Sequence, residues 1–272
     1  MTVVAEDLHP AGVAFDAIAD LYDSLFTGSL IGRAQRTAVW RETLCVFRPG
    51  DRILELNCGT GEDALFLAGR GIRVCACDAS PRMIGQAKTR RAAEAPLSPI
   101  DFRILRTEHI DSLRGEGQFD GVFSNFSGLN CVNDLARTAR SLASLVRPRA
   151  NLLLCVSTRY CLWEIAHYAT KGDFRRAFRR CRGFAEVHLN GHSLPVHYPT
   201  LRLMRKWFDP FFRLRSVTGI GVVVPPSYLE AWTQNHLGML RMCEAADRML
   251  SRLPGARVLG DHMLLHMERL TR

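Results

Sequence analysis

The chain has 272 residues, of which 47% are hydrophobic and 23% are charged, and its formal net charge is +9. This length allows one sizeable core, and the composition is that of an ordinary globular protein, which excludes a disordered or fibrous chain. No apolar stretch reaches membrane-spanning length, and the first residues lack the basic start and apolar centre of a secretory signal. The positive charge leaves nucleic acid, an anionic membrane surface and an acidic small molecule open as partners.

The nine cysteines are scattered through predicted strands and helices, without the paired spacing of a disulfide framework or a zinc site. Cys75 and Cys77 share one face of a predicted strand, but a metal would need two further ligands, so we expect no metal site. This cysteine usage fits a reducing compartment, and we expect a soluble cytoplasmic protein.

A helical region opens the chain and a strand, a turn and a helix follow it. Residues 14–46 are predicted to form helices, because apolar positions such as Phe15 recur at spacings of three and four. Arg52–Leu56 is then a short apolar strand, Asn57–Gly61 a turn, and Glu62–Ala68 the start of a helix with acidic residues in its first turn.

The same unit then repeats. Arg73–Cys77 is predicted as a second strand, and Ser80 and Pro81 open the next helix as its cap and first residue. The alternation continues through strands at Phe102–Leu105, Gly121–Ser124 and Leu152–Val156 and a helix at Asp134–Val146. Alternation of this kind predicts an α/β fold, a Rossmann-like, doubly wound and mostly parallel sheet with helices on both faces.

The alternation of predicted strands and helices is interrupted after Ser157. The residues that follow are rich in Arg, His and aromatic side chains, which indicates an insertion over the active site. Strands at Leu214–Val224 and Met263–Leu270, with a helix at Ser227–Leu253 between them, are expected to complete a seven-stranded sheet with an antiparallel hairpin edge. The predicted organisation is an N-terminal helical cap in residues 1–50, a Rossmann-like core in 51–157, a substrate-binding insertion in 158–213 and the completion of the sheet in 214–272.

Two glycines, Gly59 and Gly61, lie between the first strand and its helix. Bare backbone and the free amides of the helix start favour a closely bound, electron-rich ligand there. Asp78, at the end of the second strand, is placed to accept hydrogen bonds from ribose hydroxyls. The pattern Gly59-x-Gly61-x-x-Ala64 also satisfies the dinucleotide fingerprint. A nicotinamide oxidoreductase therefore stays open, as does a tight turn with no ligand.

Three features favour a sulfonium methyl donor over a dinucleotide. A carboxylate at Glu55, the end of the first strand, can hold a cationic amine and would repel a pyrophosphate. The helices before the first strand can form a cap over the ligand, and this cap carries Tyr22. Phe119–Val132 ends the fourth strand with a polar and aromatic cluster, where a sulfonium and an acceptor can meet.

Residues 14–157 resemble the class I S-adenosylmethionine-dependent methyltransferases, especially the UbiE-like branch that acts on small molecules. ELNCGTG is similar to the glycine-rich first motif of that family, with Asn57 in place of its first glycine. CDASPRMIGQAK resembles the ribose-binding second motif, and FDGVFSN resembles the fourth. LVRPRANLLL is similar to the stretch before the fifth strand, with Arg149 and Ala150 in place of two glycines. The resemblance implies methyl transfer with S-adenosyl-L-methionine as the cofactor.

The resemblance also implies roles for individual residues. Tyr22 would cover the cofactor, Met83 would pack near the adenine, and Asn125 and Phe126 would lie near the reacting methyl group. Glu108 or His109 would contact the adenine amino group. The full set of implied cofactor-binding residues is Tyr22, Glu55, Asn57, Gly59, Gly61, Asp78, Ala79, Met83, Glu108, His109, Asn125 and Phe126.

The acceptor is less well defined by the sequence. Holding a nucleophile in line with the methyl group supplies much of the catalysis, so a dedicated base is optional. The candidate catalytic residues are His167, Glu164, His197 and Asn130, with His188 and His192 as further histidines of the insertion. Aromatic side chains are expected either to line an apolar acceptor pocket or to pack in the core, at Tyr160, Trp163, Tyr168, Phe174, Phe178, Tyr198, Trp207 and Phe208. An apolar acceptor of lipid, isoprenoid or polyketide type would fit.

Lys171–Gly183 holds six basic residues against one acidic residue. A solvated helix face, an anionic membrane surface and an anionic acceptor are all open for this segment. A nucleic-acid methyltransferase is the second hypothesis. However, the fourth motif lacks the Asn-Pro-Pro-aromatic loop used on base amines, and no RNA-binding module is recognisable. We therefore expect a small-molecule acceptor, and the sequence leaves the oligomeric state open.

Overall fold

A computed structural model describes residues 10–271 of the chain. The main sheet contains β1 (Arg52–Leu56), β2 (Arg73–Asp78), β3 (Ile100–Ile104), β4 (Phe119–Ser124), β5 (Val146–Ser157), β8 (Phe212–Ile220) and β9 (His262–Arg269). Their order is β3-β2-β1-β4-β5-β9-β8, and β9 runs antiparallel to both of its neighbours. The predicted seven-stranded, mostly parallel sheet with an antiparallel C-terminal edge is confirmed.

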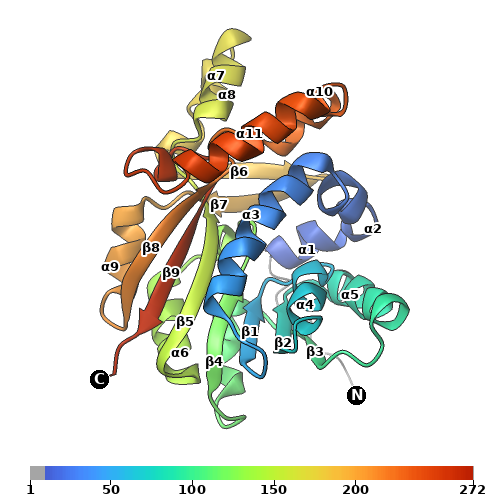
Figure 1. Cartoon of the computed structure of the whole chain (residues 1–272), viewed down its shortest axis with the longest axis vertical. Helices are drawn as coiled ribbons and strands as arrows, with labels where there is room; N and C mark the ends of the chain where they lie inside the picture. The colour runs from blue at the N-terminus through green and yellow to red at the C-terminus, as the bar shows by residue number, and fades with distance from the viewer. Residues whose placement is uncertain (1–9, 272) are drawn as a thin grey trace.

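Helices cover both faces of this sheet (Figure 1). The α-helices are α1 (Pro10–Asp16), α2 (Ala19–Tyr22), α3 (Leu30–Val46), α4 (Glu62–Ala68), α5 (Pro81–Glu94), α6 (Leu135–Leu145), α7 (Leu162–Thr170), α8 (Phe174–Ala177), α9 (Leu201–Phe208), α10 (Glu230–Gln234) and α11 (Leu237–Leu250). The π-helical turn η1 (Asp23–Thr27) and the 3₁₀ turns η2 (Thr107–Leu113), η3 (Gly128–Cys131), η4 (Arg180–Arg182), η5 (Ser227–Leu229) and η6 (Ala256–Val258) connect them. Ser80 caps α5 by accepting a hydrogen bond from the Met83 amide, as predicted.

Successive residues of the central strands are buried on opposite faces of the sheet, as the two-residue period of a strand requires. Ile53 packs in one apolar cluster with Val39 of α3 and Leu67 of α4. Leu54 packs in another with Leu142 of α6. The parallel sheet is thus buried on both faces, and its ligand-accessible positions lie at the carboxyl ends of the strands.

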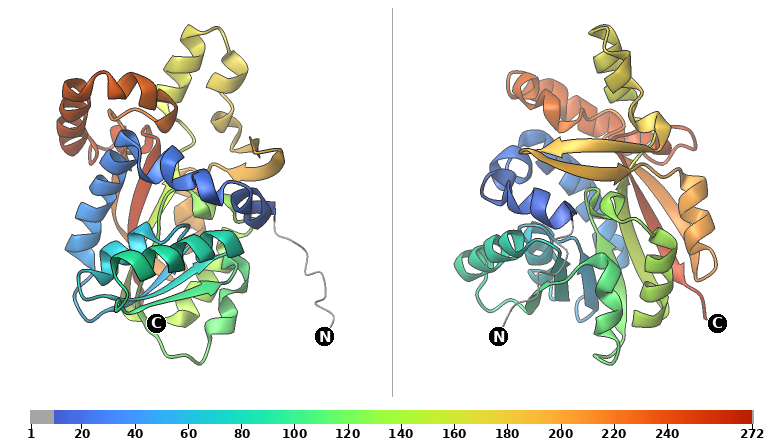
Figure 2. Two further views of the ribbon diagram at one scale, coloured as in Figure 1. Left: turned by 90° about the vertical axis from the view of Figure 1, so that its right-hand side faces the viewer. Right: turned by 180° about the vertical axis from the view of Figure 1, so that it is seen from behind.

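The segment after β5 differs in detail from its prediction. It contains α7, α8 and a separate hairpin of β6 (Phe184–Leu189) and β7 (His192–His197), which Figure 2 shows projecting beyond the main sheet. The sequence prediction missed this hairpin, although its two-residue turn, Asn190 and Gly191 with φ angles of 46° and 84°, has the Asn-Gly sequence that is typical of hairpins. The helix α9 also lies inside the predicted insertion 158–213, but Met204 and Phe208 of α9 are buried in the α6 cluster. We therefore propose that the insertion proper ends before α9.

The C-terminal region also departs from its predicted boundaries. The strand expected at Leu214–Val224 ends at Ile220, because Gly221 turns the chain with a positive φ of 65°. The long helix expected at Ser227–Leu253 is broken into α10 and α11. Between residues 10 and 271, no helix combines the length and apolarity that a membrane crossing requires.

The N-terminal helices lie over the carboxyl ends of the strands, between α5 and the hairpin (Figures 1 and 2). The Asp16 carboxylate accepts hydrogen bonds from the Ser80 hydroxyl and from the Arg82 amide, which fastens α1 to the start of α5. On its other side, Ala14 packs against Leu194 and Val196 of β7. The helices α1 and α2 thus lie over the strand ends, whereas α3, also within the predicted cap, packs on a face of the sheet; residues 1–9 lie outside the described residues.

Candidate functional site

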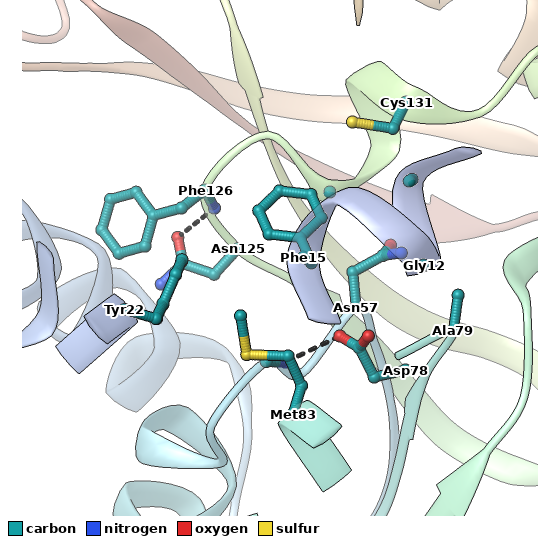
Figure 3. A pocket seen from close by; sticks show the side chains of 13 residues that line it. Gly12, Phe15, Tyr22, Asn57, Asp78, Ala79, Met83, Asn125, Phe126 and Cys131 are labelled. Atoms are coloured by element: carbon teal, nitrogen blue, oxygen red, sulfur yellow. Dashed lines mark hydrogen bonds between the residues drawn. The ribbon is translucent and has the colours of Figure 1, made fainter. Parts of the chain in front are cut away.

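A pocket opens at the carboxyl ends of β1, β2 and β4 (Figure 3). This edge is where open α/β sheets bind ligands. The pocket is lined by Ala11, Gly12, Phe15, Tyr22, Asn57, Gly59, Asp78, Ala79, Met83, Asn125, Phe126, Gly128 and Cys131.

The two glycines of the loop after β1, Gly59 and Gly61, serve different structural purposes. Both have positive φ angles, 54° at Gly59 and 78° at Gly61. A Cβ atom on Gly61 would lie 2.9 Å from Cβ of Ala87, so this glycine allows α5 to pack closely on the loop. A Cβ atom on Gly59 would meet only the Tyr22 ring, at 3.9 Å. Gly59 therefore leaves bare backbone at the pocket wall, where a ligand can approach it closely.

Asp78 ends β2 and lines the same pocket. The Gly59 amide donates to one carboxylate oxygen at 2.8 Å, and the Ser80 amide donates to the other at 2.9 Å. Burial raises the pKa of Asp78, and these two hydrogen bonds oppose that rise. Each carboxylate oxygen can accept a second hydrogen bond, so Asp78 can bind a vicinal diol while it holds the loop in shape.

Glu55 is the most buried carboxylate beside the pocket, with 1% of its surface exposed. Its Oε2 atom has no hydrogen-bond partner among residues 10–271. Burial raises the pKa of Glu55 well above its ordinary value, and the nearby Asp63 adds to the rise. An uncompensated buried carboxylate is costly, and a cationic group would relieve that cost. The site therefore has one position that suits an amine.

A buried polar network supports this side of the pocket. Asp63, in the first turn of α4, accepts hydrogen bonds from Arg36 at 2.5 Å, Trp40 at 2.6 Å and the Asn125 amide group at 3.1 Å. These contacts fix Asn125 at the pocket wall and tie α3 to the end of β4. Sequence reasoning missed Arg36, Trp40 and Asp63, because only the tertiary packing of α3 brings them together.

Aromatic side chains of the N-terminal helices cover the pocket. The Tyr22 ring lies between Phe15 and Phe26, with centroid distances of 6.3 Å and 5.9 Å, and Phe26 meets Phe126 edge-on at 4.9 Å. Burial raises the pKa of Tyr22 to about 12, so its hydroxyl stays protonated. Asp23, the next residue, accepts a hydrogen bond from Thr60 at 2.7 Å and thereby joins the cover to the glycine loop.

The structure brings most of the predicted cofactor-binding residues together. Tyr22, Asn57, Gly59, Asp78, Ala79, Met83, Asn125 and Phe126 line one pocket. Glu55 and Gly61 are buried in the strand end and loop beside it, whereas Glu108 and His109 lie on η2 outside the lining. Sequence reasoning missed Ala11, Gly12 and Gly128. A Cβ atom on Gly12 would lie 3.0 Å from the Ala79 carbonyl oxygen, a tertiary contact without a local sequence signal.

The four predicted catalytic residues lie outside this lining. Glu164 is buried, and its two carboxylate oxygens accept hydrogen bonds from Arg179 at 2.6 Å and Arg180 at 2.9 Å. Arg180 also pairs with Asp261 at 2.9 Å. This ion-pair network occupies the Glu164 carboxylate, which favours a structural role. It also places Arg180 in the interior, whereas each of the three alternatives considered for the basic segment has its arginines at the surface or at a ligand.

Asn130 is also engaged in structural contacts. Its amide group donates to the His197 carbonyl at 2.6 Å, and its carbonyl oxygen accepts from the Ser157 amide at 2.9 Å. Asn130 thereby joins the ends of β5 and β7. The rings of His167 and Tyr228 pack together with a centroid distance of 4.9 Å. The imidazole Nε2 of His197 lies 3.4 Å from the carbonyl oxygen of the Asn133 side chain.

The aromatic side chains of the region after β5 are dispersed. Phe208 is part of the main core, and Trp207 packs against it. Tyr198 is buried beneath Arg180, whereas Phe174 and Phe178 are exposed. These side chains therefore do not share one acceptor pocket in the part of the chain that the structure describes.

Comparisons with known proteins agree with this geometry. Residues 53–149 match the family described as "Methyltransferase domain". The chain is 31% identical over 142 residues to a 2-phytyl-1,4-naphtoquinone methyltransferase of Trichormus variabilis, a match that covers 50% of this chain and 59% of the relative. It is 28% identical over 151 residues to a demethylmenaquinone methyltransferase of Beutenbergia cavernae, covering 55% of this chain and 58% of the relative. The matches thus span less than two thirds of these curated relatives.

Solved structures extend the likeness in fold to most of the chain. An S-adenosylmethionine-dependent methyltransferase from Mesorhizobium loti superposes with a TM-score of 0.54 at 15% identity, covering 87% of this chain and 98% of that one. The N-methyltransferase NodS from Bradyrhizobium japonicum, solved with S-adenosyl-L-homocysteine, gives a TM-score of 0.52 at 15% identity, covering 90% and 89%. This chain therefore has the Rossmann-like fold of these solved methyltransferases, and its residues 53–149 match the methyltransferase domain family.

Proposed function

We propose that this protein is an S-adenosylmethionine-dependent methyltransferase that acts on a small molecule. One observation supports the proposal most strongly. The pocket is lined by Asp78, which can bind a ribose diol, and beside it lies the buried Oε2 of Glu55, for which residues 10–271 offer no hydrogen-bond partner. A nucleoside that carries a cationic amino-acid tail satisfies both groups.

The same electrostatics argue against a dinucleotide. A pyrophosphate would bring negative charge next to Glu55, Asp63 and Asp78, and the pKa of Glu55 is already raised by its buried position and by those neighbours. Like charges in a site of low dielectric repel strongly. A zwitterionic sulfonium nucleoside brings positive charge to that position instead.

The chain's own residues would bind, orient and enclose the reactants. When bound, the cofactor supplies an electrophilic methyl group. Asp78 would hold the ribose, Glu55 the methionine amine and Met83 one side of the adenine. Asn125, fixed by Asp63, would orient the reacting end. The Tyr22 ring would exclude water above it, so that the reactants meet at near-attack distance.

For the acceptor we propose an apolar hydroxyaromatic molecule of the quinone type. The support is the activity for which the two curated relatives are named, 2-phytyl-1,4-naphtoquinone methyltransferase and demethylmenaquinone methyltransferase. The direct test is incubation of the pure protein with S-adenosylmethionine and a panel of reduced naphthoquinones and naphthols. Mass spectrometry would be expected to find one added methyl group on at least one member, and no reaction when the cofactor is omitted.

We also propose peripheral contact with an anionic membrane surface, and a cytoplasmic location. Phe174 is 62% exposed, next to the exposed Arg175 and Arg176, and Met242 and Met249 of α11 are 70% and 78% exposed. Figures 1 and 2 place α8 and α11 at the same end of the molecule. Exposed apolar side chains beside cationic ones suit a surface of anionic lipid headgroups. The nine cysteines are free thiols, in keeping with a reducing compartment.

A further inference from the structure

His262, the first residue of β9, lies at the edge of the sheet where the pocket opens. Because β9 runs antiparallel to β5, the start of β9 meets the carboxyl end of β5, and His262 is paired with Ser157. The Phe126 ring, which lines the pocket, packs edge-on against the imidazole with a centroid distance of 5.5 Å. His262 is not one of the residues assigned to cofactor binding, so cofactor binding does not account for a buried imidazole at this position.

Two serine hydroxyls connect to this imidazole. His262 Nε2 lies 2.9 Å from Ser127 Oγ, and Ser127 Oγ lies 2.6 Å from Ser157 Oγ. Ser127 stands between Phe126 and Gly128, both of which line the pocket, and it is itself partly exposed. A proton received at Ser127 therefore has a short route to the imidazole.

The backbone at Ser127 is held in an unfavourable conformation. Phe126 and Ser127 have consecutive positive φ angles of 44° and 67°. Residues other than glycine rarely adopt such angles, and strain of this kind gathers at functional sites. In this conformation the Ser127 hydroxyl lies within hydrogen-bond distance of His262.

The surroundings of His262 keep the ring neutral and orient it. His262 is 6% exposed, and burial holds its pKa below 6.5. Nδ1 has no hydrogen-bond partner within the described chain, but the Asp261 carboxylate lies 3.6 Å from it. Asp261 in turn accepts from Arg180, and Arg36 lies over the far side of the Phe126 ring at 4.9 Å. With the Nδ1 proton facing Asp261, Nε2 is free to accept a proton from Ser127.

We propose that Ser127 and His262 form the proton-accepting site of the methyl transfer, and that the acceptor binds with an aromatic hydroxyl group at Ser127 Oγ. This inference rests on the proposed function. His262 acts through Ser127 and is therefore a positioning residue, whereas Ser127 would touch the acceptor. A neutral hydroxyl or quinol group is the chemistry that such a pair recognises.

The proton and electron movements balance. The acceptor hydroxyl gives its proton to Ser127 Oγ while Ser127 passes its own proton to His262 Nε2, and the resulting imidazolium faces the Asp261 carboxylate. The electron pair left on the acceptor forms the new bond to the methyl carbon, from the oxygen or from a conjugated ring carbon. The electrons of the broken methyl–sulfur bond stay on sulfur. A methylated ring carbon then loses its own proton to water.

The test compares His262→Gln with the wild type in the naphthol and quinol assay. Glutamine can keep the hydrogen bond to Ser127 but cannot take up the proton. We expect kcat to fall at least about 100-fold while KM for the acceptor changes less than about twofold. In the wild type, kcat should decline toward acidic pH as His262 becomes protonated, and this decline should be absent in His262→Gln. Ser127→Ala should lose kcat similarly.

His266→Gln is the matched control. His266 lies on the same strand, and its imidazole lies 3.0 Å from the Asn151 side chain. This variant should keep the wild-type rate and pH profile. If His262→Gln keeps both as well, the inference is overturned while the proposed function stands.

A second measurement does not depend on turnover. In the protein labelled with ¹⁵N-histidine, the nuclear magnetic resonance spectrum at pH 7 should show His262 neutral with Nε2 unprotonated, and Ser127→Ala should shift this resonance. A charged ring, or a proton on Nε2, would overturn the inference even if no acceptor in the panel reacts. Failure of the wild type to bind S-adenosyl-L-homocysteine would instead count against the proposed function.

Discussion

The Asn57 side chain occupies the space that a side chain at position 128 would need. A Cβ atom on Gly128 would lie 2.2 Å from the Asn57 Cβ atom and 2.6 Å from its Cγ atom. Asn57 itself has a φ of 56°, in the left-handed region. The loop after β1 and the turn after β4 therefore interlock at the pocket wall, and the residue at each position restricts the choice at the other.

This interlock predicts that Gly128→Ala destabilises the fold by about 1–3 kcal/mol, because the added methyl group overpacks a closed contact. Asn57→Gly removes the obstructing side chain and suits a left-handed backbone. The double variant should therefore recover most of the loss, as measured by urea unfolding of all four proteins. Independent, additive effects of the two substitutions would show that the two loops are not in contact.

Local sequence patterns predicted the part of the site that lies close together along the chain. The strand Arg52–Leu56 and the helix Glu62–Ala68 have the bounds that the sequence predicted, and Asp78 meets the glycine loop. Strand period, helix capping and turn chemistry are short-range effects, and a parallel sheet brings the ends of neighbouring strands to one edge. These effects determine the part of the pocket that is formed by the glycine loop and Asp78.

Other contacts depend on tertiary packing and escaped the sequence analysis. His262 reaches Ser127 across 135 positions of the chain. Its place follows only once β9 is known to run antiparallel to β5. A solvated basic face was one of the alternatives for the segment that holds Arg180, yet Arg180 is buried beside Glu164 and Asp261. Charge patterning identifies a basic segment, but it does not show which of its side chains find a buried partner.

Glu164→Gln should lower the free energy of unfolding by about 3 kcal/mol, because it leaves Arg180 buried with less than its full counter-charge. Chemical denaturation would measure the loss. Glu186→Gln, an exposed carboxylate on β6, is the matched control and should change stability by less than about 0.5 kcal/mol. Equal effects of the two substitutions would contradict the structural role assigned to Glu164.

The buried histidine should also make stability depend on pH. Burial holds the pKa of His262 below 6.5, so between that lowered value and 6.5 the unfolded chain binds a proton that the folded chain does not. The contribution of His262 to the free energy of unfolding should therefore decrease as pH falls from 7.5 to 5, whereas Glu55, whose pKa is raised, contributes in the opposite direction. His262→Gln should reduce this dependence in urea titrations, although His266, whose pKa is also lowered by burial, leaves a part of it. An unchanged dependence in His262→Gln would mean that His262 does not titrate in this way.

Contact with an anionic membrane should depend on the exposed arginines of α8. Arg175→Glu with Arg176→Glu should weaken binding to phosphatidylglycerol-containing vesicles at least about tenfold, since each basic side chain near such a surface contributes about 1 kcal/mol. Co-sedimentation would measure this. Arg137→Glu with Arg140→Glu makes the same charge change on α6 and should have little effect. Equal losses in the two pairs would indicate a general charge effect without a docking surface.

Calorimetric titration of the pure protein with S-adenosyl-L-homocysteine, and separately with NAD⁺, tests the central claim most directly. We predict that the nucleoside binds, that NAD⁺ does not, and that Asp78→Asn weakens binding about 10- to 100-fold, because a charge-assisted hydrogen bond to the ribose is lost. Asp101→Asn, an exposed carboxylate on β3, should leave the affinity unchanged. Binding of NAD⁺ without binding of the nucleoside would contradict the account.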